Sequence, residues 1–151
     1  MFHVALWEPE IPPNTGNIAR LCAATGARLH LIGRLGFRID DKAVRRAGLD
    51  YWEHVDVIHH PDWNAFLLAV EGRRIWLIDN PADETYTTAR FRDRDVLLFG
   101  NETKGLPESL RKEYVGQLLG IPMPTGKVRS LNLSNAVAIV LYEAMRQTCD
   151  W

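Results

Sequence analysis

The sequence has few cysteines and no long apolar run. Only Cys22 and Cys149 are cysteines among its 151 residues, and they form neither a Cys-x-x-Cys pair nor a disulfide framework. The first eight residues lack the basic region and the long apolar core of a signal peptide, and no apolar run approaches the length of a membrane span. These absences predict a reducing, cytoplasmic location and no membrane partner.

The sequence also lacks an excess of charge of either sign. It has 18 Lys and Arg residues against 19 Asp and Glu residues, so its net charge is −1 at pH 7. Such a chain is not attracted to nucleic acid as a whole, and RNA binding would need a local basic patch. Two groups of residues are candidates for that patch: Arg34, Arg38, Lys42, Arg45 and Arg46, and Lys104, Arg111, Lys112, Lys127 and Arg129. Solvated surface charge explains them equally well.

Several motifs of catalytic and ligand-binding sites are missing. The histidines and cysteines show no metal-ligand spacing, so we predict no metal site. The segment 100–107 follows a predicted strand and precedes a predicted helix, yet the sequence has neither a P-loop nor a Gly-x-Gly-x-x-Gly fingerprint. Ser130 and Ser134 lack the context of a nucleophile elbow. Covalent catalysis is therefore not expected.

Apolar runs alternate with segments of helical periodicity along the chain. The runs predict strands at 2–7, 28–33, 54–59, 74–79, 95–99 and 118–121. Helices are predicted at 14–26, with Asn14 or Thr15 as the N-cap, and at 40–47, 62–70, 106–114 and 131–147. This order predicts one α/β domain over residues 1–151, with a mostly parallel sheet and helices on both faces.

The segment 121–143 contains an unusual group of polar residues where an apolar helix begins. The group consists of Ser130, Asn132, Ser134 and Asn135. Serine and asparagine compete with helix backbone hydrogen bonds and favour caps and turns. One N-cap with solvated neighbours would explain the group, and so would a polar surface built at the helix N-terminus. The helix that follows is apolar around most of its girth, which fits a dimer surface and a deeply buried core helix equally.

Three loops are candidates for a ligand site, because ligands bind beyond the carboxyl ends of the strands in open parallel sheets. They comprise residues 8–17, 99–107 and 122–135, and they are rich in glycine, proline and small polar residues. We expect a pocket made mainly of backbone groups. Its possible functional side chains are Arg20, Glu102, Arg129 and Ser130.

Three stretches of the chain resemble the motifs of the SPOUT RNA methyltransferases. They read EPEIPPNTGNIARLC at 8–22, FGNETKGLP at 99–107, and IPM at 121–123 with RSLNLSNA at 129–136. Their order and separations match, and the resemblance covers nearly the whole chain. More narrowly, the chain is similar to the 2′-O-methyltransferases of the tRNA wobble nucleotide, which DK at 41–42 and RRAGLDY at 45–51 also support.

This resemblance implies a C-terminal trefoil knot, a homodimer and bound S-adenosylmethionine. It implies methyl transfer to a ribose 2′-hydroxyl in tRNA, at a wobble cytidine, a wobble carboxymethylaminomethyluridine, or both. The alternatives are a ribose methyltransferase for another tRNA or rRNA position, a non-catalytic RNA-binding module, and a flavodoxin-like nucleotide-binding regulator. The last is disfavoured by the missing phosphate fingerprints.

The resemblance also implies roles for individual residues. Arg20 is assigned to catalysis, and we expect it to position the hydroxyl and stabilise the developing alkoxide, because a guanidinium stays protonated. The expected cofactor-binding residues are Ile78, Gly100, Ile121 and Ser130. The candidates for substrate contact or loop organisation are Asn14, Asn17, Glu102, Arg129, Asn132, Asn135 and Tyr142.

Two of these candidates keep alternative interpretations. Glu102 could organise its loop, pair with Arg20 across the dimer, or cap a helix. Tyr142 fits core packing or dimer contact, and it could also stack on an RNA base.

Overall fold

The computed structural model describes residues 1–40, 42, 46 and 49–151. Its strands are β1 (His3–Trp7), β2 (Arg28–Ile32), β3 (Val57–His60), β4 (Ile75–Ile78), β5 (Glu84–Thr85), β6 (Val96–Phe99) and β7 (Leu118–Gly120). Its helices are α1 (Pro12–Thr25), α3 (Trp63–Ala69), α4 (Glu108–Glu113) and α5 (Leu133–Thr148), with short 3₁₀ helices η1 (Leu49–His54) and η2 (Val115–Gln117).

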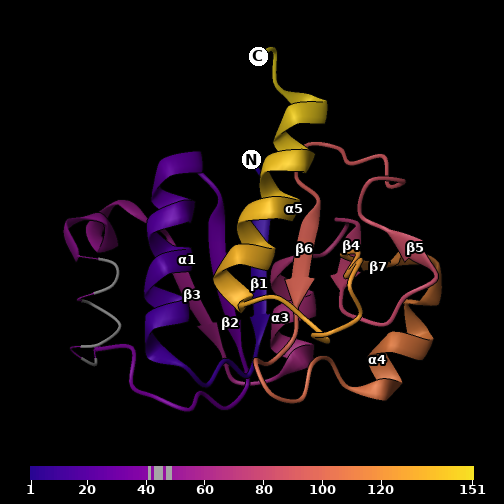
Figure 1. The fold of residues 1–151 in the computed structure, drawn as a ribbon. Coiled ribbons are helices and arrows are strands. Elements are labelled where there is room, and N and C mark those ends of the chain that lie inside the picture. The colour runs from indigo at the N-terminus through magenta and orange to yellow at the C-terminus, as the bar shows by residue number, and fades with distance from the viewer. Residues whose placement is uncertain (41, 43–45, 47–48) are drawn as a thin grey trace.

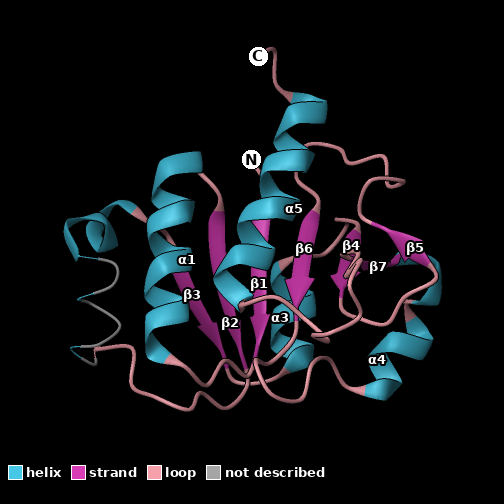
Figure 2. Ribbon diagram, viewed as in Figure 1, coloured by secondary structure: helices cyan, strands magenta, loops and turns pink. Residues whose placement is uncertain are grey.

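The strands form one sheet in the order β3-β2-β1-β6-β4-β7-β5, and all neighbouring strands run parallel. Helices α1 and α5 lie side by side on one face, and α3 covers the other (Figures 1 and 2). The prediction of an α/β fold with a parallel sheet and helices on both faces is confirmed. None of the helices in the described ranges is long and apolar enough to cross a membrane.

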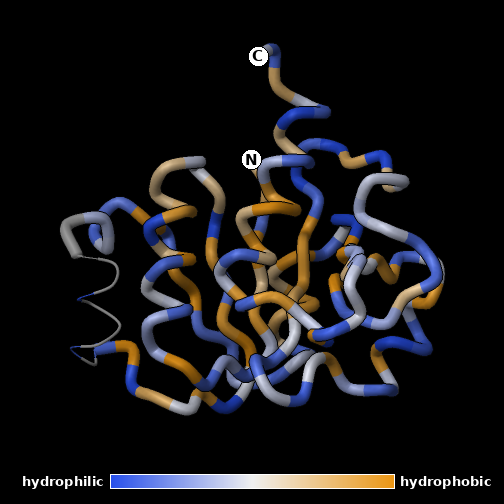
Figure 3. The backbone as a smooth tube through the Cα atoms, viewed as in Figure 1, coloured by the Kyte–Doolittle hydropathy of each residue, from blue (hydrophilic) through white to orange (hydrophobic). Residues whose placement is uncertain are grey.

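Burial on both faces explains why the strands read as continuous apolar runs. Strand β6 shows this directly: Leu97 and Phe99 belong to the hydrophobic cluster under α1 and α5, whereas Val96 and Leu98 belong to the cluster under α3. The hydropathy of the backbone follows the same pattern, with the most apolar segments in the central strands (Figure 3). A strand without a polar face is therefore the expected result of this architecture.

Element boundaries differ from the predictions in several places. Helix α1 begins at Pro12, its N-cap residue is Ile11, and no side chain caps it, so the prediction of Asn14 or Thr15 as the cap is wrong. Proline at the first helical positions has the φ angle that a helix needs, and its missing N–H is not required there. Strand β3 starts at Val57 rather than at residue 54, because 49–54 form η1.

Other predicted elements have mixed outcomes. Helix α3 lies within the predicted range 62–70, and Asp62 caps it, since its carboxylate accepts a hydrogen bond from the Ala65 N–H at 2.8 Å. Helix α5 starts at Leu133, with Asn132 as its N-cap. The two-residue strand β5 has too little sequence to show a pattern and was not predicted. The predicted helix at 40–47 lies largely outside the described residues.

Three buried histidines form a row across adjacent strands. Nδ1 of His3 lies 2.8 Å from Nε2 of His30, and Nδ1 of His30 lies 2.8 Å from Nε2 of His60. The rings are stacked at 5.1 Å between centroids, and Phe66 of α3 contacts His30 and His60 edge-on. When all three rings are neutral, each N···N contact can be a hydrogen bond in which one ring donates its N–H to the acceptor nitrogen of the next. Within the described ranges, no group of three or more His, Cys, Asp or Glu side chains, this row included, is arranged so that it could hold a metal ion.

Burial makes this histidine row sensitive to acid. Desolvation lowers the pKa of His3 to about 4 and that of His30 to about 3, from 6.5, and it lowers the pKa of His60 as well. The unfolded chain therefore takes up more protons than the folded one as the pH falls below 6.5. We expect the free energy of unfolding to fall by about 2 kcal/mol or more between pH 7 and pH 4.5, as measured by urea denaturation.

In the variant His30→Phe, the free energy of unfolding should fall less between pH 7 and pH 4.5, because the middle ring of the row can no longer titrate. His54→Gln, at an exposed position outside the row, is the matched control and should behave as wild type. If the free energy of unfolding falls equally in His30→Phe and in the wild type, the prediction is wrong.

Candidate functional site

A cavity of about 570 Å³ lies beyond the carboxyl ends of β4, β6 and β7. All four residues predicted to bind a cofactor line it, namely Ile78, Gly100, Ile121 and Ser130. Glu102 and Arg129 line it too, and the first turn of α5 closes one side. Residues from three separate parts of the sequence are thus brought to one place. We call this space the first cavity.

The turn at 100–105 is held in a tight conformation. Asn101 and Gly105 exchange backbone hydrogen bonds, and Oδ1 of Asn101 accepts hydrogen bonds from the N–H groups of Thr103 and Lys104. Gly105 has a φ of 68°, in the left-handed region that favours glycine. A Cβ on Gly100 would lie 2.5 Å from the carbonyl carbon of Gly105. Only glycine at position 100 allows the two backbone segments to approach so closely.

Asp79, directly after β4, holds this turn against helix α4. Its Oδ2 accepts hydrogen bonds from the Leu106 N–H at 3.1 Å and from Nη1 of Arg111 at 2.8 Å. Both charged side chains are largely buried, so solvent screens their attraction only in part. Arg111 also donates to the Pro81 carbonyl. Two loops that line the first cavity, after β4 and after β6, are thus held against helix α4.

Asn80, the next residue, connects both ends of the loop 121–129. Its Nδ2 donates to the carbonyl oxygens of Ile121, at 3.0 Å, and Arg129, at 3.4 Å, while its Oδ1 accepts from the Ile121 N–H at 3.1 Å. The side chain therefore acts on Ile121 as a neighbouring strand would. A ligand at Ile121 meets an N–H that is already engaged, and the carbonyl oxygen keeps a second lone pair for it.

The sequence analysis did not identify Asp79, Asn80 or Arg111 as site residues, although Arg111 was counted in a basic group. The available signal was the polar pair Asp79-Asn80 directly after a buried strand, where ligand sites form. Their partners lie 27 to 49 residues away in the chain. No local pattern reveals such contacts.

Glu102 organises the loop before α1. Its carboxylate accepts hydrogen bonds from the N–H groups of Glu10, at 2.9 Å, and Ile11, at 2.6 Å, and from Nδ2 of Asn14 at 3.4 Å. Two of these donors are N–H groups just before the start of a helix, where a negative charge is favourable. The loop-organising interpretation of Glu102 agrees with these contacts.

Asn14 and Asn132 extend this connection to the polar group at the start of α5. Oδ1 of Asn14 accepts a hydrogen bond from Nδ2 of Asn132 at 3.0 Å. Oδ1 of Asn132 in turn accepts from the N–H groups of Ser134, at 2.9 Å, and Asn135, at 3.4 Å. Asn132 is therefore the N-cap of α5, in agreement with the cap interpretation, and it also links α5 to the first turn of α1. A ligand-binding role for the polar surface stays a prediction. Asn14, Asn132 and Asn135 belong to this hydrogen-bond network but are not among the described residues that line the first cavity.

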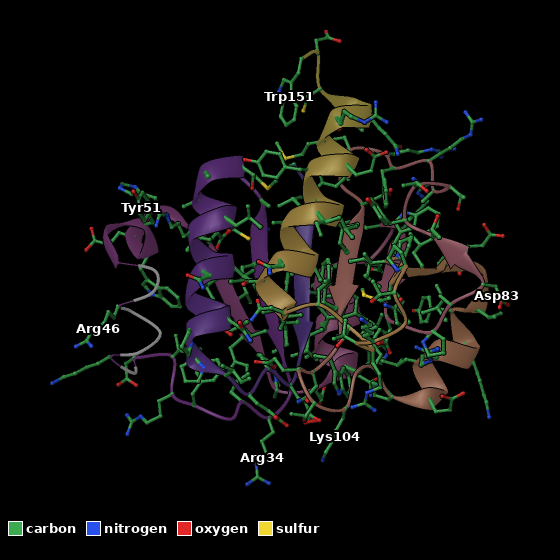
Figure 4. All side chains as sticks on the ribbon, viewed as in Figure 1. Arg34, Arg46, Tyr51, Asp83, Lys104 and Trp151 are labelled. Atoms are coloured by element: carbon green, nitrogen blue, oxygen red, sulfur yellow. The ribbon has the colours of Figure 1, made fainter. Side chains whose placement is uncertain are left out.

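Three further predicted site residues lie outside both the first cavity and this hydrogen-bond network. Arg20 is exposed on α1, is not among the described residues that line the first cavity, and has its guanidinium carbon 4.8 Å from the centroid of the Tyr51 ring. Tyr51 lies on the side of α1 that faces away from α5 (Figure 4). Asn17 is exposed on α1, and Tyr142 is 44% exposed on α5 beside Trp151. These residues contribute to the first cavity only if another molecule approaches.

Comparison with known proteins places the chain in a family. Residues 1–142 match the model of the SpoU rRNA Methylase family, and the chain belongs to this family. The tRNA (cytidine(34)-2′-O)-methyltransferase of Escherichia coli strain K12 is 49% identical over 148 residues, which are 97% of this chain and 94% of that protein. A Bacillus subtilis protein with the same name, given as putative, is 48% identical and covers 96% of this chain and 92% of its own length.

Solved structures agree with this assignment. A structure described as giving insights into the 2-OH methylation of C/U34 on tRNA has a TM-score of 0.90 and 49% identity, and the match covers 97% of this chain and 90% of the other. The methyltransferase AviRb of Streptomyces viridochromogenes, in complex with AdoMet, has a TM-score of 0.84 and 31% identity, with 96% and 59% covered. The resemblance to RNA methyltransferases is confirmed, and the trefoil knot stays a prediction.

The close contact at Gly100 leads to a prediction about stability. Gly100→Ala is expected to lower the free energy of unfolding by about 1–3 kcal/mol, because the methyl group must displace the backbone of Gly105. The matched control is Gly116→Ala in η2, where a Cβ would meet no atom within 4 Å. Its effect should stay within about 0.5 kcal/mol. Urea denaturation of both variants checks this, and equal stabilities would contradict it.

Proposed function

We propose that the protein is an S-adenosylmethionine-dependent methyltransferase that modifies the ribose 2′-hydroxyl of the wobble nucleotide of tRNA. The observation that carries the proposal is the first cavity, where the second and third family motifs meet at the carboxyl edge of the sheet. The first motif is joined to it through Glu102, which accepts hydrogen bonds from the N–H groups of Glu10 and Ile11. Relatives with 48–49% identity over nearly the whole chain carry the name of this activity at cytidine 34. A cytoplasmic location follows from this substrate.

The residues of the first cavity fit the proposed cofactor. Its volume of about 570 Å³ falls in the range of small-molecule sites. Ile78, Leu133 and Ala136 supply an apolar slot suited to a purine ring, and backbone groups near Gly100 and Ile121 supply polar contacts for its edge. Ser130 adds a hydroxyl. When bound, S-adenosylmethionine supplies a methyl group on a positively charged sulfur.

Arg20 is the proposed catalytic residue. A 2′-hydroxyl is a weak nucleophile near neutral pH, so it must be held in line with the methyl group and lose its proton as the new bond forms. The Arg20 guanidinium is suited to hold the hydroxyl or an adjacent phosphate and to stabilise negative charge on the oxygen. Within one chain, however, Arg20 contacts Tyr51 rather than the first cavity.

A homodimer resolves this separation. The outer face of α5 exposes Ile139 (36%) and Tyr142 (44%), and Trp151 after the helix is 72% exposed. We propose that a second copy covers this face and α1, so that its Arg20 reaches the first cavity. Each site would then combine the cofactor residues of one chain with Arg20 of the partner.

Methyl transfer tests the proposed function. Purified protein, radiolabelled S-adenosylmethionine and unmodified tRNA should give labelled tRNA, with the methyl group mapped by mass spectrometry to the wobble ribose. Arg20→Ala should lower turnover by about 100-fold or more, with cofactor binding unchanged. Arg90→Ala, at an exposed arginine on a different loop, should retain activity.

Other outcomes separate the alternatives. Absence of both transfer and cofactor binding would refute the proposal. Tight tRNA binding without wild-type turnover would favour a non-catalytic RNA-binding module. Methylation mapped to a different nucleotide would favour another tRNA or rRNA position.

Mixed dimers test whether Arg20 acts across the interface. Ser130→Trp should block the first cavity, because a large ring replaces a small side chain that lines it. Ser130→Trp and Arg20→Ala should each be inactive alone. When the two variants are mixed and exchange subunits, part of the wild-type turnover should return. In such a dimer one site pairs an intact cavity with an intact Arg20. Without restoration, despite exchange confirmed by native mass spectrometry, Arg20 would not act in trans.

A further inference from the structure

A second cavity, of about 470 Å³, adjoins the first. We infer that it binds the base of a nucleotide that flanks the methylated one in the same RNA. The inference rests on the proposed function, because it takes the ribose that receives the methyl group to lie at the first cavity, beside the bound S-adenosylmethionine. Four observations support it: the two cavities share a wall, and the second contains an aromatic ring, a carboxylate and two cationic side chains.

The shared wall is the tight turn at 100–105. Asn101, Lys104, Gly105 and Leu106 line both cavities. This turn is fixed by Asp79 on one side and by its own backbone hydrogen bonds. A strand whose ribose lies at the first cavity therefore has its neighbouring base next to the second.

Trp7 supplies a platform for that base. It ends β1 and is partly exposed, and its indole packs edge-on against Trp63 of α3 with the centroids 6.0 Å apart. This contact holds the ring in one orientation. Leu35, Leu106 and Pro107 provide further apolar surface around it. Bases of single-stranded RNA stack on such fixed aromatic rings whatever their identity.

Glu8 supplies a hydrogen-bond acceptor. Its Oε2 accepts one long hydrogen bond, 3.4 Å from the Arg34 N–H, and a carboxylate has about four lone-pair sites. Glu10 also lines the second cavity, but its two carboxylate oxygens already accept hydrogen bonds from Asn101 and Thr103. Glu8 also has a φ of 41°, an uncommon backbone conformation for this residue type. A carboxylate here favours a base with an exocyclic amino group, such as adenine, guanine or cytosine, over uracil.

Arg34 and Lys104 supply positive charge at the rim. Both side chains are exposed and extend from the edge of the molecule where the strands end (Figure 4). They come from different loops, after β2 and after β6. Each of the two basic groups noted in the sequence thus contributes one residue. Their charge complements the phosphates on either side of a bound nucleotide.

Abasic RNA tests the inference by binding alone. The probes are anticodon stem-loop RNAs, intact or lacking one base at a position that flanks the wobble nucleotide, and the readout is the equilibrium Kd. For the wild-type protein, removal of one flanking base should weaken binding by about tenfold. For Trp7→Leu the same removal should change Kd less than twofold, because the platform is already gone. Equal effects in both proteins, or no effect in wild type, would overturn the inference.

Further variants separate stacking from a general loss of structure. Trp7→Tyr keeps an aromatic ring and should retain most of the abasic effect. Trp76→Leu is the control: it removes a partly buried Trp that hydrogen-bonds Asp95, and removal of the flanking base should weaken RNA binding as much as in the wild type. Circular dichroism establishes which variants fold, and the comparison uses those. If Trp7→Tyr loses the effect as fully as Trp7→Leu, the aromatic platform is wrong.

Charge and base identity give two further measurements. Arg34→Ala with Lys104→Ala should weaken binding of every probe and reduce the salt dependence, whereas Arg90→Ala with Arg92→Ala, an equal change of charge on another loop, should not. Glu8→Gln should lessen the preference for an amino-bearing base over uracil. The Kd is measured without turnover. If removal of the flanking base weakens RNA binding as expected but the RNA is not methylated, only the proposed function is contradicted.

Discussion

The candidate site depends on a short chain of hydrogen bonds from Glu102 through Asn14 to Asn132. These bonds connect the 100–107 loop, the first turn of α1 and the N-cap of α5, which are far apart in the sequence. Glu102 also accepts the backbone N–H groups of Glu10 and Ile11, and Asn132 accepts that of Ser134. Loss of one member would leave polar groups of the other two segments without partners, which costs more than the bond itself contributes. The network therefore ties the 100–107 loop, which lines the first cavity, to the starts of α1 and α5.

Much of this arrangement could be predicted from the sequence. A parallel sheet covered on both faces needs strands without polar residues, so apolar runs marked the strands reliably. The carboxyl edge of such a sheet concentrates loops, so the three polar loops could be assigned to one site. The first residue of a helix was harder to predict. For α1, Pro12 and Pro13 are as typical of a helix start as Asn14 and Thr15 are of an N-cap. Strand β5 was missed because only its pairing with β7 defines it.

The contacts of Asp79, Asn80 and Arg111 could not be predicted, for a different reason. A lone Asp or Asn after a strand has no periodicity, and its role depends on which distant backbone groups come within reach. Arg20 raises a related problem. Its expected role is catalytic, yet a single chain places it against Tyr51, so the proposed role requires the second copy that we propose.

The two faces of the sheet differ in chemistry. The face under α1 and α5 is apolar and connects to the surface proposed to bind a second copy. The face under α3 contains the histidine row, whose polar atoms satisfy one another without water. Trp7 and Trp63 also lie on this side, so the proposed nucleobase platform is built from the same layer as the acid-sensitive row.

The Asn80 side chain has a thermodynamic consequence for any ligand of the first cavity. By fixing Ile121 and Arg129 together, it closes the loop between them during folding. The entropy of closing that loop is then already lost before a ligand arrives. Binding in the first cavity is stronger by that amount than it would be for a loop free at one end, which is preorganisation by a single amide.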